Sequence, residues 1–456
     1  MAKTLTRTTI LDSLEKIGEE IKVSGWVHTV RAHGKIAFLD LRDRTGFLQV
    51  GAFTSELAEQ FAKLGQQDVV SITGTLKKRE EKYINSALPT GTIELEAKEL
   101  TVLSKSAEMP FDMATKDLHL ELPTLLDYRA LTLRHPQQQA IFKVQEQIVE
   151  EFRKAAKELG CMEVFVPTLA PSASEGGADV FKVDYYGRDA YLTQSPQLYK
   201  QILLGAFERV FMISHAYRAE PSVTTRHLSE VVQIDVELAF IEEFGELLDA
   251  LEFVGTSIIK HTASVCKDVL TLYGVDEPLI PVNIPRLTLR EAQKIVTERT
   301  SRDLSRELDL NPEDEKEICA WAATEHKSDF VTITHFPTKK RAFYTHPDPE
   351  NPEYSLSYDL LFKGIEISSG SKRINDYQQL LGAMKERGID PSGFTLYLQA
   401  FKYGIPPEGG FSFGIERLTM KLLNLANVRE ASLFPRDMER IDERLSQVDQ
   451  KTKKKS

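Results

Sequence analysis

Residues 216–240 read AYRAEPSVTTRHLSEVVQIDVELAF, and the prediction of the fold depends most on this stretch. Apolar and polar residues alternate at both of its ends, which predicts two strands joined by a polar loop. The loop begins at Arg218-Ala219-Glu220 and ends at Arg226-His227-Leu228. Guanidinium groups match phosphate oxygens, so two arginines that flank a loop suit a polyphosphate. On this segment alone, a surface network of ion pairs is the better interpretation.

Two later segments carry similar residues. Residues 359–373, DLLFKGIEISSGSKR, place Asp359 and Glu366 on strands around a turn, where their carboxylates can hold Mg²⁺. Taken singly, such acids are more often plain turn and strand residues. Residues 406–417, PPEGGFSFGIER, lead through glycines to Gly414-Ile415-Glu416-Arg417. The sequence contains neither a P-loop motif nor a strand-following G-x-G-x-x-G, so it supports neither of those nucleotide sites.

Residues 136–456 predict a large domain of strands and helices. Strand patterns recur on both sides of residues 244–340, which are mostly helical. Residues 105–135 are interrupted by prolines and are interpreted as a hinge between two domains. A long amphipathic helix is expected to follow the hinge and to stop at Gly160. Its apolar residues at helical spacing are Ile141, Val144, Ile148, Phe152 and Ala156.

Residues 1–104 have a different pattern. Four segments show period-2 apolar alternation over 21–30, 36–53, 69–80 and 93–103, and the second is divided by a turn at Thr45-Gly46. A helical pattern follows the third expected strand. Five short strands with a helix between the third and fourth are typical of an OB-type barrel, whose open face binds oligonucleotides. Many small β-barrels share this pattern.

The composition favours an ordinary globular enzyme. The chain has 456 residues, of which 41% are hydrophobic and 27% charged, and its net charge is −11. No apolar run reaches the ~18 residues of a membrane-spanning helix, and the first 20 residues are too polar for a signal peptide. The three cysteines are far apart, which fits a reducing cytosol and excludes a disulfide framework. A cytoplasmic protein that does not bind membranes is therefore expected, and an acidic total does not exclude a nucleic-acid partner.

Taken together, these segments resemble the class II aminoacyl-tRNA synthetases (subclass IIb) and, within them, the aspartyl-tRNA synthetases of the archaeal type. The resemblance covers essentially the whole chain. It implies a multidomain α+β protein with an N-terminal OB-fold barrel and a catalytic domain built on an antiparallel sheet flanked by helices. The segments that match the family, in order, are CMEVFVPTLAP (161–171), SASEGGADVF (172–181), QSPQLYKQ (194–201), AYRAE…TTRHLSEVVQIDVELAF (216–240), EISSGSKR (366–373) and GGFSFGIERLTM (409–420).

The resemblance implies a pocket for the substrate aspartate. Lys200 and Arg373 would bind its side-chain carboxylate, while Glu175 and Asp235 would hold its ammonium group. Leu198 and Tyr199 lie in the same binding segment and contribute either backbone or packing. A site of this kind can reject neutral asparagine by ~10⁴ or more. The full expected set is Glu175, Ser195, Gln197, Leu198, Tyr199, Lys200, Arg218, Asp235, Ser369 and Arg373.

The resemblance also implies ATP as a substrate and Mg²⁺ as a cofactor. Arg218 and Arg417 would be catalytic: Arg218 would clamp the α-phosphate and the aspartate carboxylate, and Arg417 would hold the γ-phosphate. Glu366 and Ser369 would bind Mg²⁺, with Asp359 as a possible helper. Val231 stands where bacterial-type relatives carry an adenine-stacking Phe, which leaves the stacking partner open. The expected ATP-binding residues are Arg218, Ala219, Glu220, Arg226, His227, Leu228, Glu366, Gly414, Ile415, Glu416 and Arg417.

The barrel, by the same resemblance, would read the tRNA anticodon. The expected contacts are Arg31, Phe38, Gln49 and Glu94, with Phe38 stacked on a base; the alternative is that Phe38 belongs to the barrel core. His28 and Pro89 match relatives that charge both tRNA(Asp) and tRNA(Asn). Relaxed tRNA choice is therefore expected, and it requires an amidotransferase that converts Asp-tRNA(Asn).

Several alternatives stay open at this point. A strict aspartyl-tRNA synthetase differs only in tRNA choice. An asparaginyl-tRNA synthetase shares the fold, but the pairing of Lys200 with Arg373 argues for an acidic side chain. A tRNA-independent asparagine synthetase would lack residues 1–104, and a non-catalytic RNA-binding paralogue would have lost Arg218 and Arg417. The overall expectation is a homodimeric aspartate–tRNA ligase.

Overall fold

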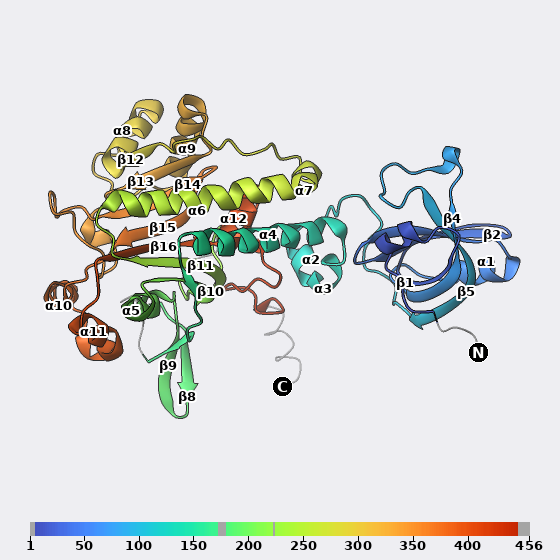
Figure 1. Ribbon diagram of the computed structural model, residues 1–456, viewed down its shortest axis with the longest axis horizontal. Coiled ribbons are helices and arrows are strands. Elements are labelled where there is room, and N and C mark those ends of the chain that lie inside the picture. Colours follow the sequence, from blue (N-terminus) through green and yellow to red (C-terminus); the bar gives the residue numbers. More distant parts are fainter. Residues whose placement is uncertain (1–4, 172–178, 222–223, 446–456) are drawn as a thin grey trace. The chain divides into compact units, whose positions relative to one another are not determined.

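The computed structural model describes residues 5–171, 179–221 and 224–445. The chain divides into two compact units, Met1–Leu120 and Glu121–Ser456 (Figure 1). No helix of the described residues is long and apolar enough to cross a membrane. Short 3₁₀ turns occur at Leu11–Glu15, Glu81–Tyr83, Thr338–Lys340, Pro391–Phe394 and Val428–Ala431.

The first unit is a closed five-stranded barrel with strand order β1-β2-β3-β5-β4. Its strands alternate buried and exposed residues, and the buried residues form one apolar core inside the barrel. The expected strands, with the helix between the third and fourth, are confirmed. They are β1 (Glu20–His33), β2 (Ile36–Asp43), β3 (Gly46–Ala52), α1 (Ser55–Ala62), β4 (Val69–Lys78) and β5 (Ile93–Ser104).

Asp68 binds the segment that follows β5 and holds it against the barrel. Its carboxylate is 2.8 Å from Lys105 Nζ and accepts hydrogen bonds from the backbone N–H groups of Gly65 (2.8 Å) and Ser106 (2.7 Å). Burial raises the pKa of Asp68, but the bonds from Lys105 and the two backbone groups outweigh burial, and the net pKa lies below 3.8. The ionised carboxylate therefore stabilises the folded barrel.

Asp68→Asn is expected to destabilise the barrel by about 1–3 kcal/mol at pH 7, because charge-assisted hydrogen bonds are lost. A lowered folded pKa gives stability that is present above the unfolded pKa and lost as the pH falls through the folded value. The difference between the two proteins should therefore shrink below about pH 4. Urea unfolding followed by Trp26 fluorescence, in a Trp321→Phe background, measures it. An equal difference at pH 7 and pH 3 would contradict this account.

The second unit is built on an eight-stranded sheet of order β12-β13-β14-β15-β16-β11-β10-β6. The strands from β13 to β10 are antiparallel, as expected, whereas the outermost pairs β12/β13 and β10/β6 are parallel. The strands are β6 (Met162–Glu163), β10 (Arg209–Tyr217), β11 (Glu230–Ala239), β12 (Arg286–Thr288), β13 (Phe330–Thr334), β14 (Ser357–Phe362), β15 (Ile365–Lys372) and β16 (Glu408–Gly414). A separate small sheet contains β7 (Leu169–Ala170), β8 (Lys182–Tyr185) and β9 (Arg188–Leu192).

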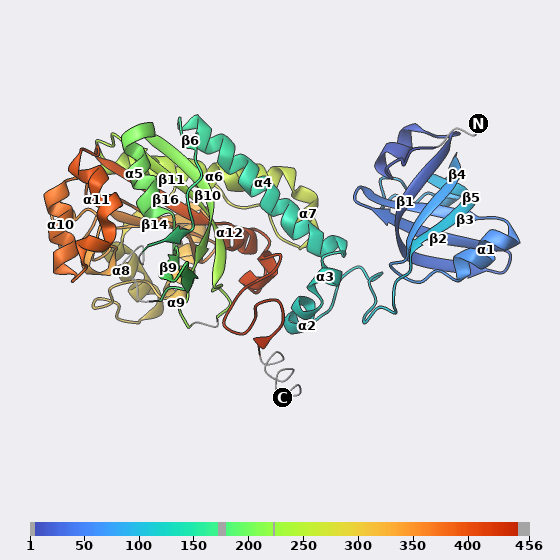
Figure 2. The ribbon, with the colours of Figure 1, turned by 90° about the horizontal axis from the view of Figure 1, so that it is seen from below.

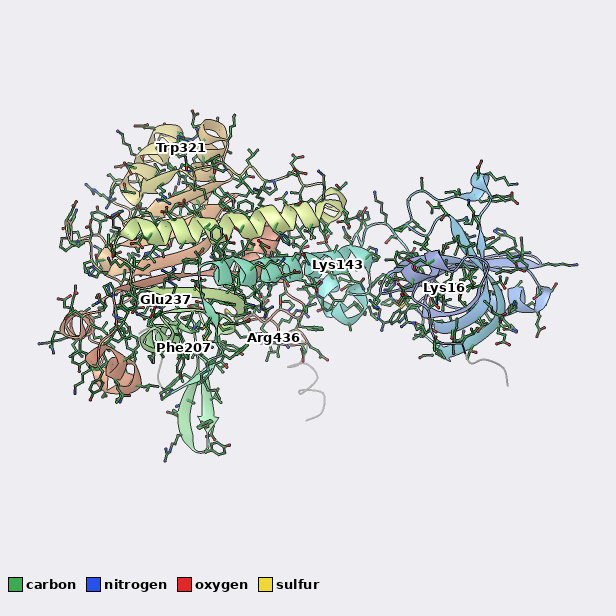
Figure 3. The ribbon with its side chains drawn as sticks, viewed as in Figure 1. Lys16, Lys143, Phe207, Glu237, Trp321 and Arg436 are labelled. Carbon is green, nitrogen blue, oxygen red and sulfur yellow. The ribbon has the colours of Figure 1, made fainter. Side chains whose placement is uncertain are left out.

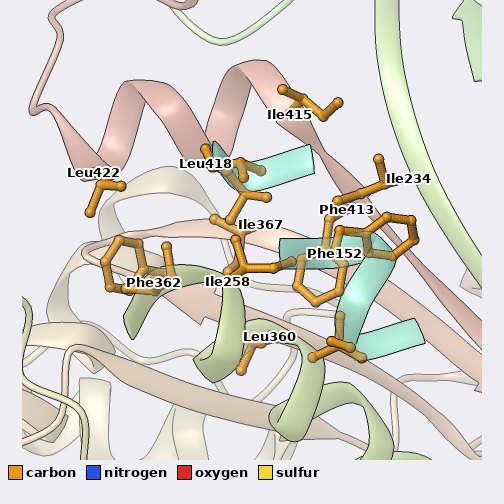
Figure 4. Close-up of a cluster of buried hydrophobic side chains, with 14 of the residues drawn as sticks. Phe152, Ile234, Ile258, Leu360, Phe362, Ile367, Phe413, Ile415, Leu418 and Leu422 are labelled. Carbon is orange, nitrogen blue, oxygen red and sulfur yellow. The ribbon is translucent and has the colours of Figure 1, made fainter. Parts of the chain in front are cut away.

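Three helices bury their apolar sides against this sheet: α4 (Pro136–Glu158), α6 (Phe244–Val265) and α12 (Ile415–Leu422). The views in Figures 1 and 2 both show α4 and α6 side by side. Phe152, Ile258 and Leu418 pack against side chains from β11, β14, β15 and β16 (Figure 4). Burying one such side chain is worth ~1.5–3 kcal/mol. This core holds one face of the sheet fixed.

The expected long helix is confirmed as α4. Pro136 occupies its first turn, where a missing N–H costs nothing, and Gly160 follows it with φ +79°. Two short helices, α2 (Leu122–Asp127) and α3 (Arg129–Thr132), lie within the expected hinge. The remaining helices are α5 (Gln197–Phe207), α7 (Lys267–Leu272), α8 (Leu289–Thr300), α9 (Pro312–His326), α10 (Tyr377–Glu386) and α11 (Thr395–Lys402).

Candidate active site

The second unit contains a cavity of about 260 Å³ over β11, β15 and β16. Segments that are far apart in the sequence meet here: the start of α5, the loop after β10, residues 341–345 and the start of α12. Most of the expected substrate-binding residues line it. They are Ser195, Gln197, Lys200, Arg218, Arg226, His227, Leu228, Asp235, Glu366, Ser369, Arg373, Gly414, Glu416 and Arg417, together with Val231.

One end of the cavity is a buried network of charges. Lys200 Nζ lies 3.1 Å from Asp235 Oδ1 and 2.9 Å from Glu237 Oε2. Arg373 Nε donates to Glu237 Oε1 at 2.7 Å, and its Nη2 donates to Gly410 O at 3.0 Å. All four charged side chains are nearly inaccessible to solvent. Two cations and two carboxylates balance one another, which is the usual condition for burying charge.

The periodicity of β11 and α5 explains why these side chains meet. On β11, Gln233, Asp235 and Glu237 point to the cavity side, and the residues between them enter the apolar core. On α5, Gln197 and Lys200 are three residues apart and share the buried face. The side chains of Leu198 and Tyr199 therefore face elsewhere, and they line a second, mainly apolar hollow. Only a backbone role in the first cavity fits those two residues.

Glu237 is a site residue that sequence reasoning missed. It is completely buried, and its carboxylate contacts both Lys200 and Arg373. Burial raises the pKa of Glu237, but Arg373 and Lys200 outweigh it and lower the pKa, so Glu237 is ionised. A Cβ atom on Gly410 would lie only 2.2 Å from Glu237 Oε2, so this position needs glycine. The signal in the sequence was the alternation Gln-Ile-Asp-Val-Glu. Figure 3 marks Glu237 on β11.

The other end of the cavity is positive. Arg417 Nη1 lies 3.5 Å from Glu366 Oε2 and donates to the Glu366 backbone oxygen at 3.1 Å. Burial, and then the charges of Arg417, Arg226 and Arg218, lower the pKa of His227. Neutral imidazole among three guanidinium groups makes this end suitable for a polyphosphate.

Several expected ATP contacts have other partners in this structure. Arg226 forms a two-pronged ion pair with Glu315 of α9, with N–O distances of 2.9 and 3.1 Å. The Glu416 carboxylate accepts from the Val232 backbone N–H at 3.0 Å, and burial raises its pKa to about 7. The side chain of Ile415 lies in the apolar core, so it can offer ATP only its backbone. Ala219 and Glu220 do not line the cavity that the described residues form.

The donor set for a metal ion is one carboxylate and one hydroxyl. Glu366 and Ser369 both line the cavity, and Mg²⁺ commonly combines such ligands with phosphate oxygens and water. Asp359, the expected helper, is instead bound to Arg341, whose Nη2 lies 2.8 Å from Asp359 Oδ2. Arg341 also donates to Ser369 Oγ at 3.1 Å and lines the cavity, and no sequence signal indicated it. Among the described residues, no group of three acidic, His or Cys side chains could hold a metal alone.

Buried polar atoms indicate that the ligand is polar. Gln197 Nε2, Gln233 Oε1 and Ser368 Oγ are inaccessible to solvent and have no hydrogen-bond partner within the described ranges. All three residues line the cavity. A buried polar group without a partner is costly, so three together favour a ligand that supplies hydrogen bonds. Glu175, the second residue expected to hold the ammonium group, lies outside the described residues.

The barrel has a hollow of about 380 Å³, which includes His28, Arg31 and Gln49. Gln49 Nε2 donates to Glu94 Oε2 at 3.0 Å, and Gln49 Oε1 accepts from Arg79 Nη2 at 3.3 Å. This fixes the orientation of the Gln49 amide. Arg79 was not anticipated from the sequence.

Phe38, His28 and Phe47 lie outside the apolar core of the barrel. Phe38 stands between the buried Ala37 and Leu39 and is only half-buried, so the core alternative for it is wrong. The His28 ring packs edge-on against Phe47 with centroids 4.8 Å apart. Pro89 is exposed and does not line the hollow, although Leu88 and Thr90 beside it do.

Comparisons with known proteins agree with the fold. Residues 121–438 match the family described as tRNA synthetases class II (D, K and N), and residues 21–103 match the OB-fold nucleic acid binding domain. A Deinococcus radiodurans protein named aspartate–tRNA(Asp/Asn) ligase is 38% identical over 97% of this chain and 100% of its own length. A protein of the same name from Methanocaldococcus jannaschii is 39% identical over 94% of this chain and 95% of its own length.

Solved structures similar to this chain are also aminoacyl-tRNA synthetases. The asparaginyl-tRNA synthetase of Pyrococcus horikoshii, complexed with asparaginyl-adenylate, superposes with a TM-score of 0.87 and 30% identity, covering 96% of this chain and 100% of that one. The chain therefore belongs to the class II aminoacyl-tRNA synthetases, in the group of the D, K and N enzymes, and carries their OB-fold domain.

Proposed function

We propose that this enzyme activates L-aspartate with ATP and transfers it to tRNA(Asp) and to tRNA(Asn). The observation that carries the amino-acid choice is the buried pair of cations, Lys200 and Arg373, at one end of the cavity. Two relatives that match almost the full length are named aspartate–tRNA(Asp/Asn) ligases. The OB-fold barrel distinguishes this chain from a tRNA-independent asparagine synthetase, which would consist of the catalytic domain alone.

The cation pair favours a carboxylate over an amide. Lys200 has three N–H donors, and its two ion pairs leave one for the substrate. Arg373 donates from Nε to Glu237, from Nη1 to Ser371 Oγ and from Nη2 to Gly410 O and Gln197 Oε1, so one Nη1 N–H and the positive charge remain for the substrate. The NH₂ group of asparagine would place donors against donors, which is the arrangement such a pocket rejects by ~10⁴. Burial raises the pKa of Asp235, and Lys200, 3.1 Å away, acts in the opposite direction. Asp235 would accept the substrate ammonium group together with Glu175.

The first step is attack by the aspartate α-carboxylate on the α-phosphorus of ATP, and pyrophosphate leaves. Arg218 would hold the α-phosphate and Arg417 the γ-phosphate, neutralising charge as it develops. Glu366 and Ser369 would hold Mg²⁺, which supplies positive charge to the phosphate oxygens when bound. In the second step, the terminal ribose hydroxyl of tRNA attacks the mixed anhydride and AMP leaves. The protein's contribution is mainly positioning.

ATP–pyrophosphate exchange tests the choice of amino acid. Exchange should depend on aspartate and should be ~10⁴-fold less efficient, as kcat/KM, with asparagine. Exchange driven by asparagine at comparable efficiency would contradict the proposed pocket. Omitting Mg²⁺ should abolish the exchange, and restoring it should recover the activity.

The barrel would read the anticodon, with Phe38 stacking on a base and Arg31, Gln49 and Glu94 contacting base edges or backbone. The Gln49 amide is held between Glu94 and Arg79, so it presents a fixed pattern of donors and acceptors. His28 lines the same hollow, and an imidazole ring leaves more room there than an indole would. This supports acceptance of two different anticodon bases, and an amidotransferase would then convert Asp-tRNA(Asn).

His28→Trp is expected to lower kcat/KM for charging tRNA(Asn) at least about tenfold, roughly 1.4 kcal/mol of lost binding, because the indole fills the hollow. Charging of tRNA(Asp) should change less than threefold. His33→Trp, at an exposed position on the same strand, is the matched control and should leave the ratio between the two tRNAs as it was. Equal losses with both tRNAs would show that His28 does not set the choice.

The assembly and location also belong to this proposal. The exposed apolar side chains Met162, Phe165 and Leu169, with Phe165 84% exposed, support a homodimer that covers them. The buried, unpaired cysteines Cys161, Cys266 and Cys319 fit a reducing compartment and so a cytoplasmic enzyme. We keep 1–104, 105–135 and 136–456 as the proposed barrel, hinge and catalytic domain.

A further inference from the structure

Glu408 lies near Glu237, Arg373 and Lys200 at the aspartate end of the cavity, but it does not line the cavity that the described residues form. It is the first residue of β16 and is completely buried. Its Oε1 accepts a hydrogen bond from Gln201 Nε2 at 2.8 Å, and Gln201 Oε1 accepts one from the Tyr397 hydroxyl at 3.1 Å. Glu408 Oε2 has no hydrogen-bond partner within the described ranges. The carboxyl group is therefore bonded to a single neutral amide.

The charges around Glu408 are already balanced without it. Lys200 on α5 and Arg373 after β15 are paired with Asp235 and Glu237 on β11, two cations with two anions. Glu408 itself forms no ion pair within 4.0 Å among the residues that the structure describes. An ionised Glu408 would be a third negative charge in the same buried network, and the side-chain carboxylate of aspartate would be a fourth.

We propose that Glu408 is a specificity-determining positioning residue, which must be a neutral carboxylic acid for Lys200 and Arg373 to attract the side-chain carboxylate of the substrate. This inference rests on the proposed aspartate activity. With Glu408 neutral, the network has no net charge and its cations can accept one more carboxylate. With Glu408 ionised, the network carries net charge −1 and repels aspartate, whereas a neutral side chain is unaffected.

The surroundings of Glu408 hold it neutral at ordinary pH. Burial, and next the adjacent Glu237 carboxylate, raise the pKa of Glu408 to about 8, although Gln201, Arg373 and Lys200 act in the opposite direction. The neighbouring hydroxyl of Tyr397 stays protonated, because burial and then the charge of Glu408 raise its pKa well above 10. Burial likewise raises the pKa of Tyr358, so neither phenol changes charge in the range of the test.

The test is the KM for aspartate in ATP–pyrophosphate exchange between pH 7 and pH 9, with Mg²⁺–ATP saturating. For a group with a pKa near 8, loss of binding on ionisation raises the KM about tenfold over this range. The kcat should change little, because aspartate still binds productively at saturation. The side chain in Glu408→Gln is neutral at every pH. The ratio of its KM for aspartate at pH 9 to that at pH 7 should therefore fall to about 1.

Glu430→Gln is the matched control, because it removes a partly buried carboxyl group that caps a turn outside the cavity. It should keep the wild-type dependence of KM on pH. Ionisation of free aspartate affects all three proteins equally, so the comparison between them isolates Glu408. A wild-type KM that stays constant to pH 9, or a Glu408→Gln protein with the same rise as wild type, would overturn the proposal.

A second measurement needs no variant and remains decisive if Glu408→Gln does not fold. Asparagine, used as a competitive inhibitor of the wild-type enzyme, should keep its Ki within twofold from pH 7 to pH 9 while the KM for aspartate rises. A parallel rise in both constants would show that the titrating group does not read side-chain charge. If no pH supports exchange with aspartate, the proposed function itself fails; robust exchange with a constant KM removes only the role of Glu408.

Discussion

Arg373→Leu is expected to lower kcat/KM for aspartate by about 10³–10⁴ in ATP–pyrophosphate exchange. Two effects act together. The substrate carboxylate loses a positive charge and an N–H donor, and Glu237, which Arg373 holds at 2.7 Å, is left buried beside Lys200 alone. Removing one partner of a buried ion pair is far more damaging than the pair's net contribution to stability, because the other charge stays uncompensated. The loss should appear in both KM and kcat.

The controls separate specificity from folding. Arg436→Leu changes a partly buried arginine that pairs with Asp442 outside the cavity, and it should keep wild-type exchange (Figure 3). Arg373→Lys retains a charge without the fork, so an intermediate loss is expected. Thermal melts establish that each variant is folded. A folded Arg373→Leu protein that loses less than tenfold would contradict the assignment of this end of the cavity to aspartate.

Arg218→Ala is expected to lower kcat by about 10²–10³ while changing the KM for ATP much less. The α-phosphate gains charge as the aspartate carboxylate attacks it, so a donor fixed at that point acts mostly on the transition state. The positive environment is visible in His227, whose pKa is lowered by burial and then by Arg417, Arg226 and Arg218. Steady-state exchange with varied ATP measures the division between kcat and KM.

Arg218→Lys should recover part of the loss, since an ammonium group supplies charge but only a point contact. Aspartate binding measured without ATP shows separately how much of the loss comes from the contact that Arg218 is expected to make with aspartate. An equal rise in the KM for ATP with an unchanged kcat would mean that Arg218 contributes uniform binding and not transition-state stabilisation.

Local patterns were enough to predict most of the fold. Period-2 alternation located the five barrel strands, and helical spacing with Gly160 located α4. These signals depend on residues close in sequence. The order β15-β16-β11-β10 pairs Gln233 of β11 with Gly414 of β16, far along the chain, and the resemblance to a known family implied an antiparallel sheet without giving this order.

The candidate site was predicted in part. Residues of the matching motifs, such as Lys200, Asp235 and Arg373, do meet in one cavity. Partners from outside those motifs were missed, because nothing local distinguishes them. Arg341 lies in the connection before β14 and pairs with Asp359 on β14, and Glu315 comes from α9 to bind Arg226.

Direct charging of tRNA tests the central claim most directly. Purified enzyme is incubated with ATP, Mg²⁺ and labelled aspartate or asparagine, on transcripts of tRNA(Asp) and tRNA(Asn) separately. The account predicts that aspartate is attached to both tRNAs and asparagine to neither. Aspartate on tRNA(Asp) alone would contradict the relaxed reading of the His28 hollow, and attachment of asparagine to either tRNA would contradict the account of the Lys200–Arg373 pocket itself.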